Sequence, residues 1–319
     1  MSGGVHTLVW VGEPAVYAGA LERAGFGGRI AVESVPPGQQ PSDEQLARAE
    51  ALLAMQVPPG VLAKMPKLRW IQALTVGIDN WLTRSDLAPA VALTCARGSH
   101  RVQMPENILG ALFHLTKPYA QATLDQRERR WVRRVSEPLA GKTLAILGLG
   151  AIGHELARKA AALELRVIGT RRSQAPVPHV ERVYPPEAID EVLGQADFVV
   201  LLLPLTSQTD RIMNTQHLKA MRTSAYLLNF GRGGLVDDDD LIAAVRDKVI
   251  AGAVLDVYRQ EPPPAEHPFW GVEGITVLPH IGGLAGGRDA IVAGIFTDNM
   301  RRYLEGAPLN ALVDRARGY

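Results

Sequence analysis

The sequence predicts an α/β fold built on doubly wound parallel sheets, and two observations carry that prediction. Short apolar runs typical of buried strands alternate along the chain with segments in which apolar residues recur at helical spacing. In addition, residues 143–153 read TLAILGLGAIG, an apolar run that leads straight into three glycines and then into a helical segment. The 319 residues favour two domains, because single hydrophobic cores stop growing at about 250 residues.

The N-terminal part predicts five strands separated by helices and loops. The strands are expected at residues 5–11, 29–35, 51–55, 69–74 and 91–94, and helices at residues 14–24 and 45–49. Ser42 or Asp43 can cap the second helix, because both side chains accept hydrogen bonds from the first turn. A long polar-to-amphipathic helix is expected over residues 105–130.

Six further strands are expected after that helix, at residues 143–147, 166–170, 198–203, 225–230, 251–257 and 274–278. The acidic residues 237–240 open a helix at residues 241–248, where carboxylates complement the helix dipole. A last helix, from Gly287 to about residue 304, lies outside the six-strand unit and is expected to pack on the N-terminal part. The predicted architecture is a Rossmann dinucleotide-binding domain (residues 99–283) inserted in a smaller flavodoxin-like α/β substrate-binding domain (residues 1–98 and 284–319).

The composition argues against several classes of protein. The formal net charge of +1 gives no general attraction to nucleic acid or membranes. No apolar run reaches the roughly 18 residues that a membrane span needs. Cys95 is the only cysteine, so no intrachain disulfide can form, which fits a reducing compartment such as the cytoplasm. The arginines of residues 127–134 are interleaved with glutamate, and a solvated helix face is expected there. The histidines show no metal-ligand spacing, so no metal is expected.

The glycine motif predicts a dinucleotide site. Gly148 permits a tight turn, Gly150 lets the backbone approach a pyrophosphate, and Gly153 lets the helix pack closely on the strand. The N-terminus of the following helix offers N–H groups and a partial positive charge to the phosphates. The cofactor-binding residues expected in this motif are Gly148, Leu149, Gly150, Ala151, Ile152 and Gly153.

Three polar residues of complementary chemistry follow three successive predicted strands. Arg232 follows residues 225–230, Glu261 follows residues 251–257, and His280 follows residues 274–278. Because the carboxyl ends of parallel strands meet at one edge of a sheet, we expect the three side chains to lie close together. Taken singly, they could be a surface arginine, a loop carboxylate and a structural histidine.

Together, the three residue types suit the reduction of a 2-keto acid. The planar fork of an arginine can bind and polarise the carboxylate and the ketone. A histidine can donate a proton near neutral pH, and a carboxylate can orient the imidazole and keep it protonated. The sequence therefore predicts Arg232, Glu261 and His280 as catalytic residues.

Several longer motifs resemble those of a known family. They are LAGKTLAILGLGAIG, DFVVLLLPLTSQT, NFGRGGLVD, DVYRQEP and LPHIGG, and the resemblance covers most of residues 70–305. On these motifs the chain resembles the D-isomer-specific 2-hydroxyacid dehydrogenases, which include glyoxylate and hydroxypyruvate reductases. The resemblance implies that Arg232, Glu261 and His280 are the catalytic trio and that Asp256 holds the nicotinamide carboxamide.

The resemblance also implies further contacts. Besides the glycine motif, the expected cofactor-binding residues are Leu203, Pro204, Thr209, Phe230, Gly231, Asp256, His280, Gly282 and Gly283. The motif LTVGID matches the family's substrate loop, so the expected substrate-binding residues are Leu74, Thr75, Val76, Gly77, Arg232 and His280. The N–H groups of Val76 and Gly77 would take the substrate carboxylate; the alternative is an ordinary βα turn. Family members are usually dimers, and residues 126–138 match the arm that crosses between subunits, which implies a homodimer. Trp131 of that arm is expected to anchor the interface or to reach the partner's active site.

Two positions depart from the family's common pattern. Many members end the second strand of the nucleotide domain with an acidic residue that bonds the ribose 2′-hydroxyl, whereas this chain has Thr170, Arg171, Arg172 and Ser173. A hydroxyl and two guanidiniums suit a 2′-phosphate, so NADP(H) is expected to be preferred and NAD(H) to remain possible. The alternative is that the arginines only face solvent. Pro105 stands where relatives often carry alanine and is expected to affect the hinge rather than the chemistry.

The sequence as a whole predicts an NADPH-preferring reductase of small 2-keto acids, with glyoxylate and hydroxypyruvate as first candidates. A D-2-hydroxyacid dehydrogenase acting on bulkier 2-keto acids is the alternative within the same class. A non-enzymatic, dinucleotide-sensing protein like the family's transcriptional corepressors is the alternative from a different class.

Overall fold

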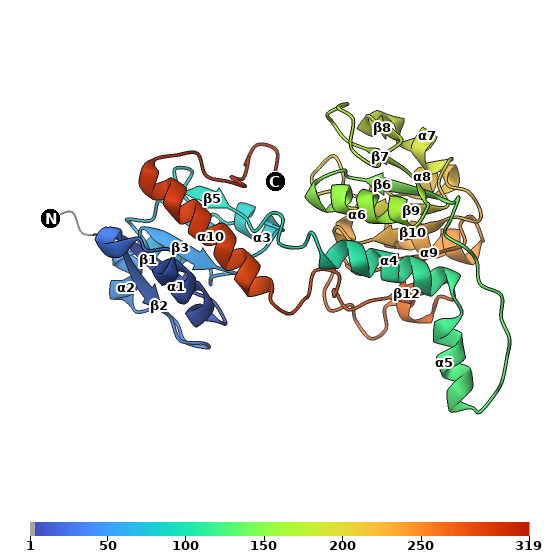
Figure 1. Ribbon diagram of the computed structural model, residues 1–319, viewed down its shortest axis with the longest axis horizontal. Coiled ribbons are helices and arrows are strands. Elements are labelled where there is room, and N and C mark those ends of the chain that lie inside the picture. The colour runs from blue at the N-terminus through green and yellow to red at the C-terminus, as the bar shows by residue number, and fades with distance from the viewer. Residues whose placement is uncertain (1–3, 319) are drawn as a thin grey trace. The chain divides into compact units, whose positions relative to one another are not determined.

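The computed structural model of the chain describes residues 4–318, which fold as two compact units. One unit combines Met1–His100 with Ala285–Tyr319, and the other is Arg101–Leu284 (Figure 1). Residues 1–3 and 319, which belong to the predicted substrate-binding domain, lie outside the described residues. Each unit is a parallel sheet with helices packed on it, so the predicted α/β class is confirmed.

The smaller unit contains a five-stranded sheet in the order β2-β1-β3-β4-β5, which is the flavodoxin-like order. Its strands are β1 (Val5–Trp10), β2 (Ile30–Ser34), β3 (Ala51–Ala54), β4 (Trp70–Ala73) and β5 (Ala92–Thr94). Its helices are α1 (Pro14–Arg23), α2 (Asp43–Arg48), α3 (Asp79–Leu82) and α10 (Arg288–Glu305). Ser42 caps α2 in a capping box with Gln45, so Ser42 rather than Asp43 is the N-cap.

Helix α10 packs on the N-terminal sheet, as expected for the last helix. The rings of Phe296 and Tyr303 on α10 each lie 5.4 Å from the ring of Trp70 on β4, measured between centroids. Trp70, Phe296 and Met300 are fully buried in the same apolar cluster, which α1 also joins through Tyr17. The C-terminal segment therefore completes the core of the smaller unit.

The larger unit contains a seven-stranded sheet in the order β12-β11-β10-β9-β6-β7-β8. Its strands are β6 (Thr143–Leu147), β7 (Arg166–Thr170), β8 (Arg182–Tyr184), β9 (Phe198–Leu201), β10 (Tyr226–Asn229), β11 (Gly252–Leu255) and β12 (Ile275–Val277). Its helices are α4 (Gln103–Thr116), α5 (Tyr119–Arg127), α6 (Ala151–Ala162), α7 (Ile189–Leu193), α8 (Thr215–Ala220) and α9 (Asp238–Arg246). Within this sheet the chain passes from β6 outward to β7 and β8, and then crosses back to β9 on the other side of β6. This is the doubly wound Rossmann order, which places a nucleotide site at the carboxyl ends of β6 and β9.

Two predictions for this unit are wrong. Strand β8 was not expected, because its three residues are too few to show a periodic pattern. The single helix expected over residues 105–130 is two helices, α4 and α5. Lys117 lies between them with φ −117° and ψ 139°, because the residue before a proline, here Pro118, is disfavoured in helical conformation.

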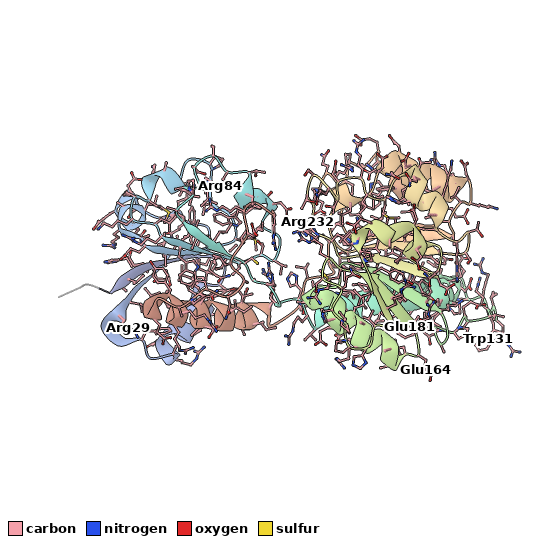
Figure 2. The ribbon with its side chains drawn as sticks, turned by 90° about the horizontal axis from the view of Figure 1, so that it is seen from above. Arg29, Arg84, Trp131, Glu164, Glu181 and Arg232 are labelled. Carbon is pink, nitrogen blue, oxygen red and sulfur yellow. The ribbon has the colours of Figure 1, made fainter. Side chains whose placement is uncertain are left out.

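Residues 130–138 form an arm without helix or strand, so the helix expected over residues 127–134 is wrong beyond Arg127, although these residues are exposed as expected. The arm returns beside α5, which projects from the rest of its unit (Figure 1). Arg130 and Arg134 of the arm both pair with Asp125 of α5, whose carboxylate is buried by them. Trp131 is 94% exposed and stands at the edge of the unit (Figure 2).

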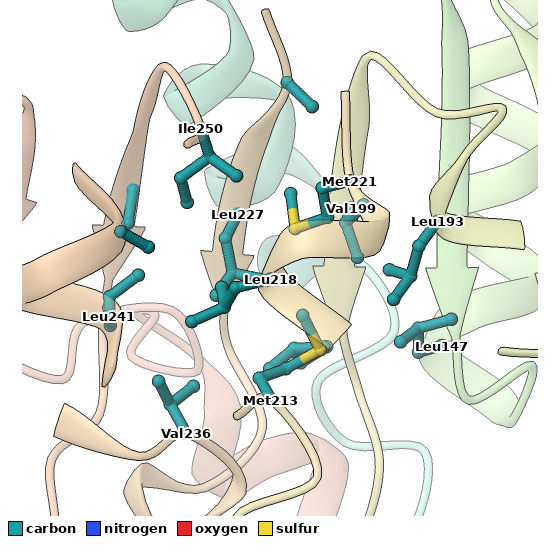
Figure 3. Packing of buried hydrophobic residues seen from close by; sticks show 14 of the residues in the cluster. Leu147, Leu193, Val199, Met213, Leu218, Met221, Leu227, Val236, Leu241 and Ile250 are labelled. Atoms are coloured by element: carbon teal, nitrogen blue, oxygen red, sulfur yellow. The ribbon is translucent and has the colours of Figure 1, made fainter. Parts of the chain in front are cut away.

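The core of the larger unit fixes the strands whose ends carry the candidate site. Leu147 of β6, Val199 of β9 and Leu227 of β10 are fully buried and pack with Leu218 and Met221 at α8 (Figure 3). Burial of each such side chain is worth about 1.5–3 kcal/mol, so the central strands are held firmly in register.

Helix α9 begins at the acidic run, as expected. The Oδ1 of Asp237 accepts a hydrogen bond from the N–H of Asp240 at 3.2 Å, and three further aspartates occupy the first turn. Over residues 4–318, no helix combines the length and apolar character that crossing a bilayer would require.

Candidate active site

The glycine motif after β6 has the backbone shape that close approach of a pyrophosphate requires. Gly148 has φ +109°, and a Cβ there would lie 2.8 Å from the carbonyl carbon of Leu202. A Cβ on Gly153 would lie 2.7 Å from the carbonyl oxygen of Gly148, so a side chain at either position would force the turn open. A Cβ on Gly150 would meet nothing within 4 Å, which leaves open space over the motif.

The N-terminus of α6 offers donors beside that open space. Gly150 is the N-cap of α6, and the N–H of His154 donates to the carbonyl of Gly150 at 3.0 Å. The preceding amides, those of Ala151, Ile152 and Gly153, have no carbonyl partner within the helix. Together with the positive end of the helix dipole, these amides fit the phosphates of a dinucleotide.

The end of β7, where a ribose would lie, carries no carboxylate. Thr170 is only 5% exposed, and its carbonyl oxygen accepts from the N–H groups of Gly148 and Leu149 at 3.3 and 3.1 Å. The Thr170 side chain is thus buried, so its hydroxyl is poorly placed for the expected contact with a 2′-phosphate. Arg171 is half-buried, and Arg172 and Ser173 are exposed.

The turn after β9 is preformed by its own polar side chain. The hydroxyl of Thr209 donates to the carbonyl of Pro204 at 2.7 Å and accepts from the N–H of Thr206 at 2.8 Å. Leu203, Pro204 and Thr209 are all half-buried. The Thr209 hydroxyl therefore shapes this side of the expected cofactor site by holding the turn.

The loop that carries Arg232 is held by Asn229 at the end of β10. The Asn229 Oδ1 accepts from the N–H of Gly231 at 3.1 Å, and its Nδ2 donates to the carbonyl of Arg232 at 2.9 Å. The half-buried guanidinium of Arg232 donates from Nη1 to the Gly231 carbonyl at 2.8 Å. Phe230 and Gly231 are buried, and a Cβ on Gly231 would lie 2.8 Å from Cδ1 of Leu235.

Glu261 and His280, 19 residues apart, are in direct contact. The Nδ1 of His280 lies 2.6 Å from Oε2 of Glu261, and the N–H of Tyr258 donates to Oε1 at 2.9 Å. A carboxylate can only accept, so Nδ1 carries a proton. Within residues 4–318 no group bonds to Nε2, and the His280 side chain is 51% exposed. His280 also has φ +51°, a strained value for a residue with a side chain, which is typical of functional positions.

Asp256 organises the loop after His280. This fully buried carboxylate accepts from the N–H of Ile281 at Oδ1 and from the N–H of Gly282 at Oδ2, both at 2.8 Å. Burial raises the pKa of Asp256, and the same two N–H groups oppose that shift. Both oxygens thus already have donors, so the structure assigns Asp256 a direct role in shaping the loop of Gly282 and Gly283, in addition to the carboxamide contact expected for it.

The sequence analysis missed two side chains that hold this loop from helix α4. The amide of Asn107 donates to the carbonyl of Gly282 at 3.0 Å, and that of Gln103 donates to the carbonyl of Gly283 at 3.1 Å. The two residues stand four positions apart, so they share one face of α4. Two amides at that spacing, at the start of a helix that is apolar over most of its length, were the available signal.

The expected substrate loop lies in the smaller unit, after β4. The carbonyl of Thr75 accepts from the N–H of Ala96 at 2.9 Å, and the carbonyl of Gly77 accepts from the hydroxyl of Thr75 at 2.6 Å. Across the described part of the chain, the N–H groups of Thr75, Val76 and Gly77 receive no acceptor. The carbonyls of Thr75 and Gly77 are thus engaged and the three amides are not, which suits an anion-binding loop.

Arg288, at the start of α10, also holds this loop and was missed. Its guanidinium, 17% exposed, donates to the carbonyl of Leu74. The neighbouring Asp289 accepts from the hydroxyl of Tyr17 at 2.7 Å, which ties the start of α10 to α1. No signal in the sequence connects Arg288 to Leu74, because 214 residues separate them.

Comparisons with known proteins identify the family of the chain. Residues 109–282, more than half of the chain, match the family model "D-isomer specific 2-hydroxyacid dehydrogenase, NAD binding domain". An (S)-sulfolactate dehydrogenase of Chromohalobacter salexigens is 32% identical over 250 residues, which cover 76% of this chain and 80% of the relative. A glyoxylate/hydroxypyruvate reductase B of Escherichia fergusonii is 30% identical over 271 residues, which cover 82% of this chain and 84% of the relative.

The fold of the whole chain has counterparts among solved structures. An NADPH-dependent glyoxylate/hydroxypyruvate reductase of Sinorhizobium meliloti, in complex with NADP and sulfate, superposes with a TM-score of 0.84 at 26% identity, covering 99% of this chain and 100% of that chain. The family model and this neighbour both support a nicotinamide dinucleotide as the cofactor. The chain therefore belongs to the D-isomer specific 2-hydroxyacid dehydrogenases, and its larger unit contains the NAD-binding domain of that family.

Proposed function

We propose that the chain reduces small 2-keto acids to 2-hydroxy acids, with glyoxylate and hydroxypyruvate as the first candidate substrates. The observation that carries the proposal is the 2.6 Å contact between Oε2 of Glu261 and Nδ1 of His280. A carboxylate at Nδ1 orients the ring, favours the imidazolium, and leaves Nε2 to meet a substrate. Named relatives that reduce glyoxylate and hydroxypyruvate support the choice of substrates.

In the proposed reaction, a reduced nicotinamide dinucleotide held at the glycine motif of Gly148, Gly150 and Gly153 would supply a hydride to the keto carbon. Arg232 binds the substrate with its planar fork of donors and polarises the ketone. His280 gives the proton of Nε2 to the ketone oxygen, which becomes the hydroxyl of the product. Glu261 stabilises the imidazolium before that transfer, and the amides of Val76 and Gly77 bind the substrate carboxylate.

NADPH is the proposed physiological cofactor, with NADH possible. The support is the end of β7, where Arg171, Arg172 and Ser173 replace an acid that would repel a 2′-phosphate. Because cells use NADPH mainly as a reductant, we propose that the reaction runs from keto acid to hydroxy acid. A single buried cysteine, Cys95, fits the reducing environment of the cytoplasm.

A homodimer is also proposed, without nucleic acid or membrane as a partner. Trp131 and Val135 of the arm are 94% and 89% exposed. Exposed apolar side chains that lie close together often mark a surface that another protein covers. A second copy is the proposed cover for them, with Trp131 as an interface anchor. Sedimentation at micromolar concentration should show a dimer in the wild type and more monomer in Trp131→Ala. A wild-type monomer would overturn the proposal.

The deciding experiment is a panel of 2-keto acids assayed with NADPH and NADH side by side. The proposal expects turnover of glyoxylate and hydroxypyruvate, faster with NADPH, and loss of turnover in Arg232→Lys, which keeps the charge but not the fork. Preference for bulkier keto acids would favour the broader dehydrogenase. Tight NADPH binding without turnover of any keto acid would favour the dinucleotide-sensing, corepressor-like alternative.

A further inference from the structure

Arg259 bridges two of the three loops that carry the proposed catalytic residues of the larger unit. It stands two residues before Glu261, yet its guanidinium reaches the loop that carries Arg232. The Nη2 of Arg259 donates to the carbonyl oxygens of Gly234 and Val236, at 3.0 and 2.8 Å. Gly234 and Val236 are both buried, so water does not readily reach their carbonyls. The Gly234 carbonyl also accepts from the N–H of Arg211 at 2.8 Å, so the Val236 carbonyl is the acceptor that depends most on Arg259.

The same two loops also touch backbone to backbone. A Cβ on Gly233 would lie 1.9 Å from the carbonyl carbon of Tyr258, so the chain directly after Arg232 is packed on the chain directly before Arg259. The carbonyl of Arg232 itself accepts from the N–H of Leu235 at 3.1 Å, inside the short helical turn Gly233–Leu235. The placement of the Arg232 backbone therefore depends on the turn that Arg259 holds.

The other end of the guanidinium meets a surface carboxylate. The Nη1 of Arg259 lies 3.4 Å from Oδ1 of Asp210, and these side chains are 32% and 49% exposed. An exposed pair of this kind contributes little to stability. The bonds to the two buried carbonyls are therefore the contacts expected to fix the loop.

We infer that Arg259 is a positioning residue that fixes the loop of Arg232 against the loop of Glu261. This inference rests on the proposed function, because it assigns Arg259 a role through the substrate-binding arginine. Nη2 donates to both carbonyls while Nη1 faces Asp210, a planar arrangement that the single ammonium group of a lysine does not reproduce.

The test compares Arg259→Met and Arg259→Lys with the wild type. Both variants should raise KM for the keto acid and lower kcat, and kcat/KM should fall roughly ten- to a hundredfold, the scale of a small misplacement of a binding group. Binding of NADPH, measured by fluorescence titration, should be unchanged, which also shows that the variants are folded. Asp210→Asn should stay within about twofold of the wild type in all constants.

Arg222→Met is the matched control. Arg222 also bonds one carbonyl, that of Gly194 at 3.2 Å, and one carboxylate, that of Asp197 at 3.1 Å, but on a different loop. It should leave the kinetics unchanged. Hydrogen exchange should speed up at residues 229–237 in Arg259→Met and not in Arg222→Met.

Wild-type constants for the keto acid in Arg259→Met would overturn the inference. A loss in Asp210→Asn as large as that in Arg259→Met would overturn it too, because the surface pair would then be the effective contact. If the wild type reduces no keto acid, the proposed function is wrong. Separately, unchanged hydrogen exchange at residues 229–237 in Arg259→Met would reject Arg259 as the residue that holds the loop.

Discussion

The carboxylate of Asp256 lies so close to the backbone of Gly282 that a side chain at position 282 would collide with it. The N–H of Gly282 donates to Oδ2 of Asp256 at 2.8 Å, and a Cβ on Gly282 would lie 2.6 Å from that same oxygen. The Cβ would also lie 2.8 Å from Cδ1 of Phe230, which is buried. This contact sets the path of the chain directly after His280.

Gly282→Ala should therefore displace the loop. Neither the carboxylate of Asp256 nor the ring of Phe230 can retreat from a buried position, and overpacking of this kind costs about 1–3 kcal/mol. We expect lower stability by urea unfolding and a loss in kcat for the keto acid. Gly294→Ala is the control, because a Cβ there meets nothing within 4 Å. Equal kinetics in both variants would contradict the expected role of Gly282.

Asp256→Asn tests the raised pKa of Asp256. A native pKa above the unfolded value means that the native state binds more protons between the two values. The contribution of this carboxyl to the free energy of unfolding is therefore largest below the unfolded pKa and falls as pH rises through the folded pKa. Because asparagine does not titrate, the wild type should gain stability relative to Asp256→Asn as the pH is lowered from 7. Urea unfolding of both proteins across the acid range measures this difference, and a difference that does not change with pH would rule out the raised pKa.

His280→Asn and Glu261→Gln test the proposed proton donor. Loss of the imidazole should lower kcat by roughly a hundredfold or more, the usual scale of general acid catalysis, with NADPH binding nearly unchanged. Glu261→Gln should also lower kcat, by roughly tenfold or more, because the imidazole loses the carboxylate that orients its ring. Near-wild-type turnover in folded His280→Asn would reject the assignment. Wild-type kcat in Glu261→Gln would reject the pairing.

The double variant Arg171→Ala/Arg172→Ala tests the cofactor preference. Each guanidinium–phosphate contact is worth about 1.5–3 kcal/mol, so two contacts could favour NADPH over NADH by on the order of a hundredfold. The variant should bring the ratio of kcat/KM for the two cofactors toward one, and high salt should do so partly in the wild type. Thr170 is left unchanged because a carboxylate there would be buried. Arg158→Ala, an exposed arginine on α6 paired with Glu155, is the control. A wild-type ratio near one would mean that Arg171 and Arg172 make no contact with a 2′-phosphate.

Arg288→Met tests the substrate loop of the smaller unit. Without the guanidinium, the Leu74 carbonyl loses its donor, and the amides of Val76 and Gly77 should be less well aligned for a carboxylate. KM for the keto acid should rise several-fold, which corresponds to the roughly 1 kcal/mol that a typical hydrogen bond contributes, with NADPH binding unchanged. Arg301→Met, also on α10 but 48% exposed, should match the wild type. If both variants behave alike, Arg288 has no special role in the loop.

The sequence predicted most of the strands because their signals are local. Residues 143–147 and 166–170 were predicted with the bounds that β6 and β7 have, since an unbroken apolar run ended by glycine or by polar residues marks a buried parallel strand. Local signals also explain the failures. Strand β8 has only three residues, and the break between α4 and α5 depends on the conformation of one residue before a proline.

The sequence by itself determined the fold class and the types of polar residue at the strand ends. Both depend on local patterns, namely glycine turns and polar residues that directly follow an apolar run. Only the tertiary structure decided which atoms meet. It brought Nδ1 of His280 to Oε2 of Glu261, turned the side chain of Thr170 into the core, and joined Arg259 to the carbonyls of Gly234 and Val236. These contacts join residues on different elements, and their geometry is fixed by packing of the whole sheet rather than by any preference of the local chain.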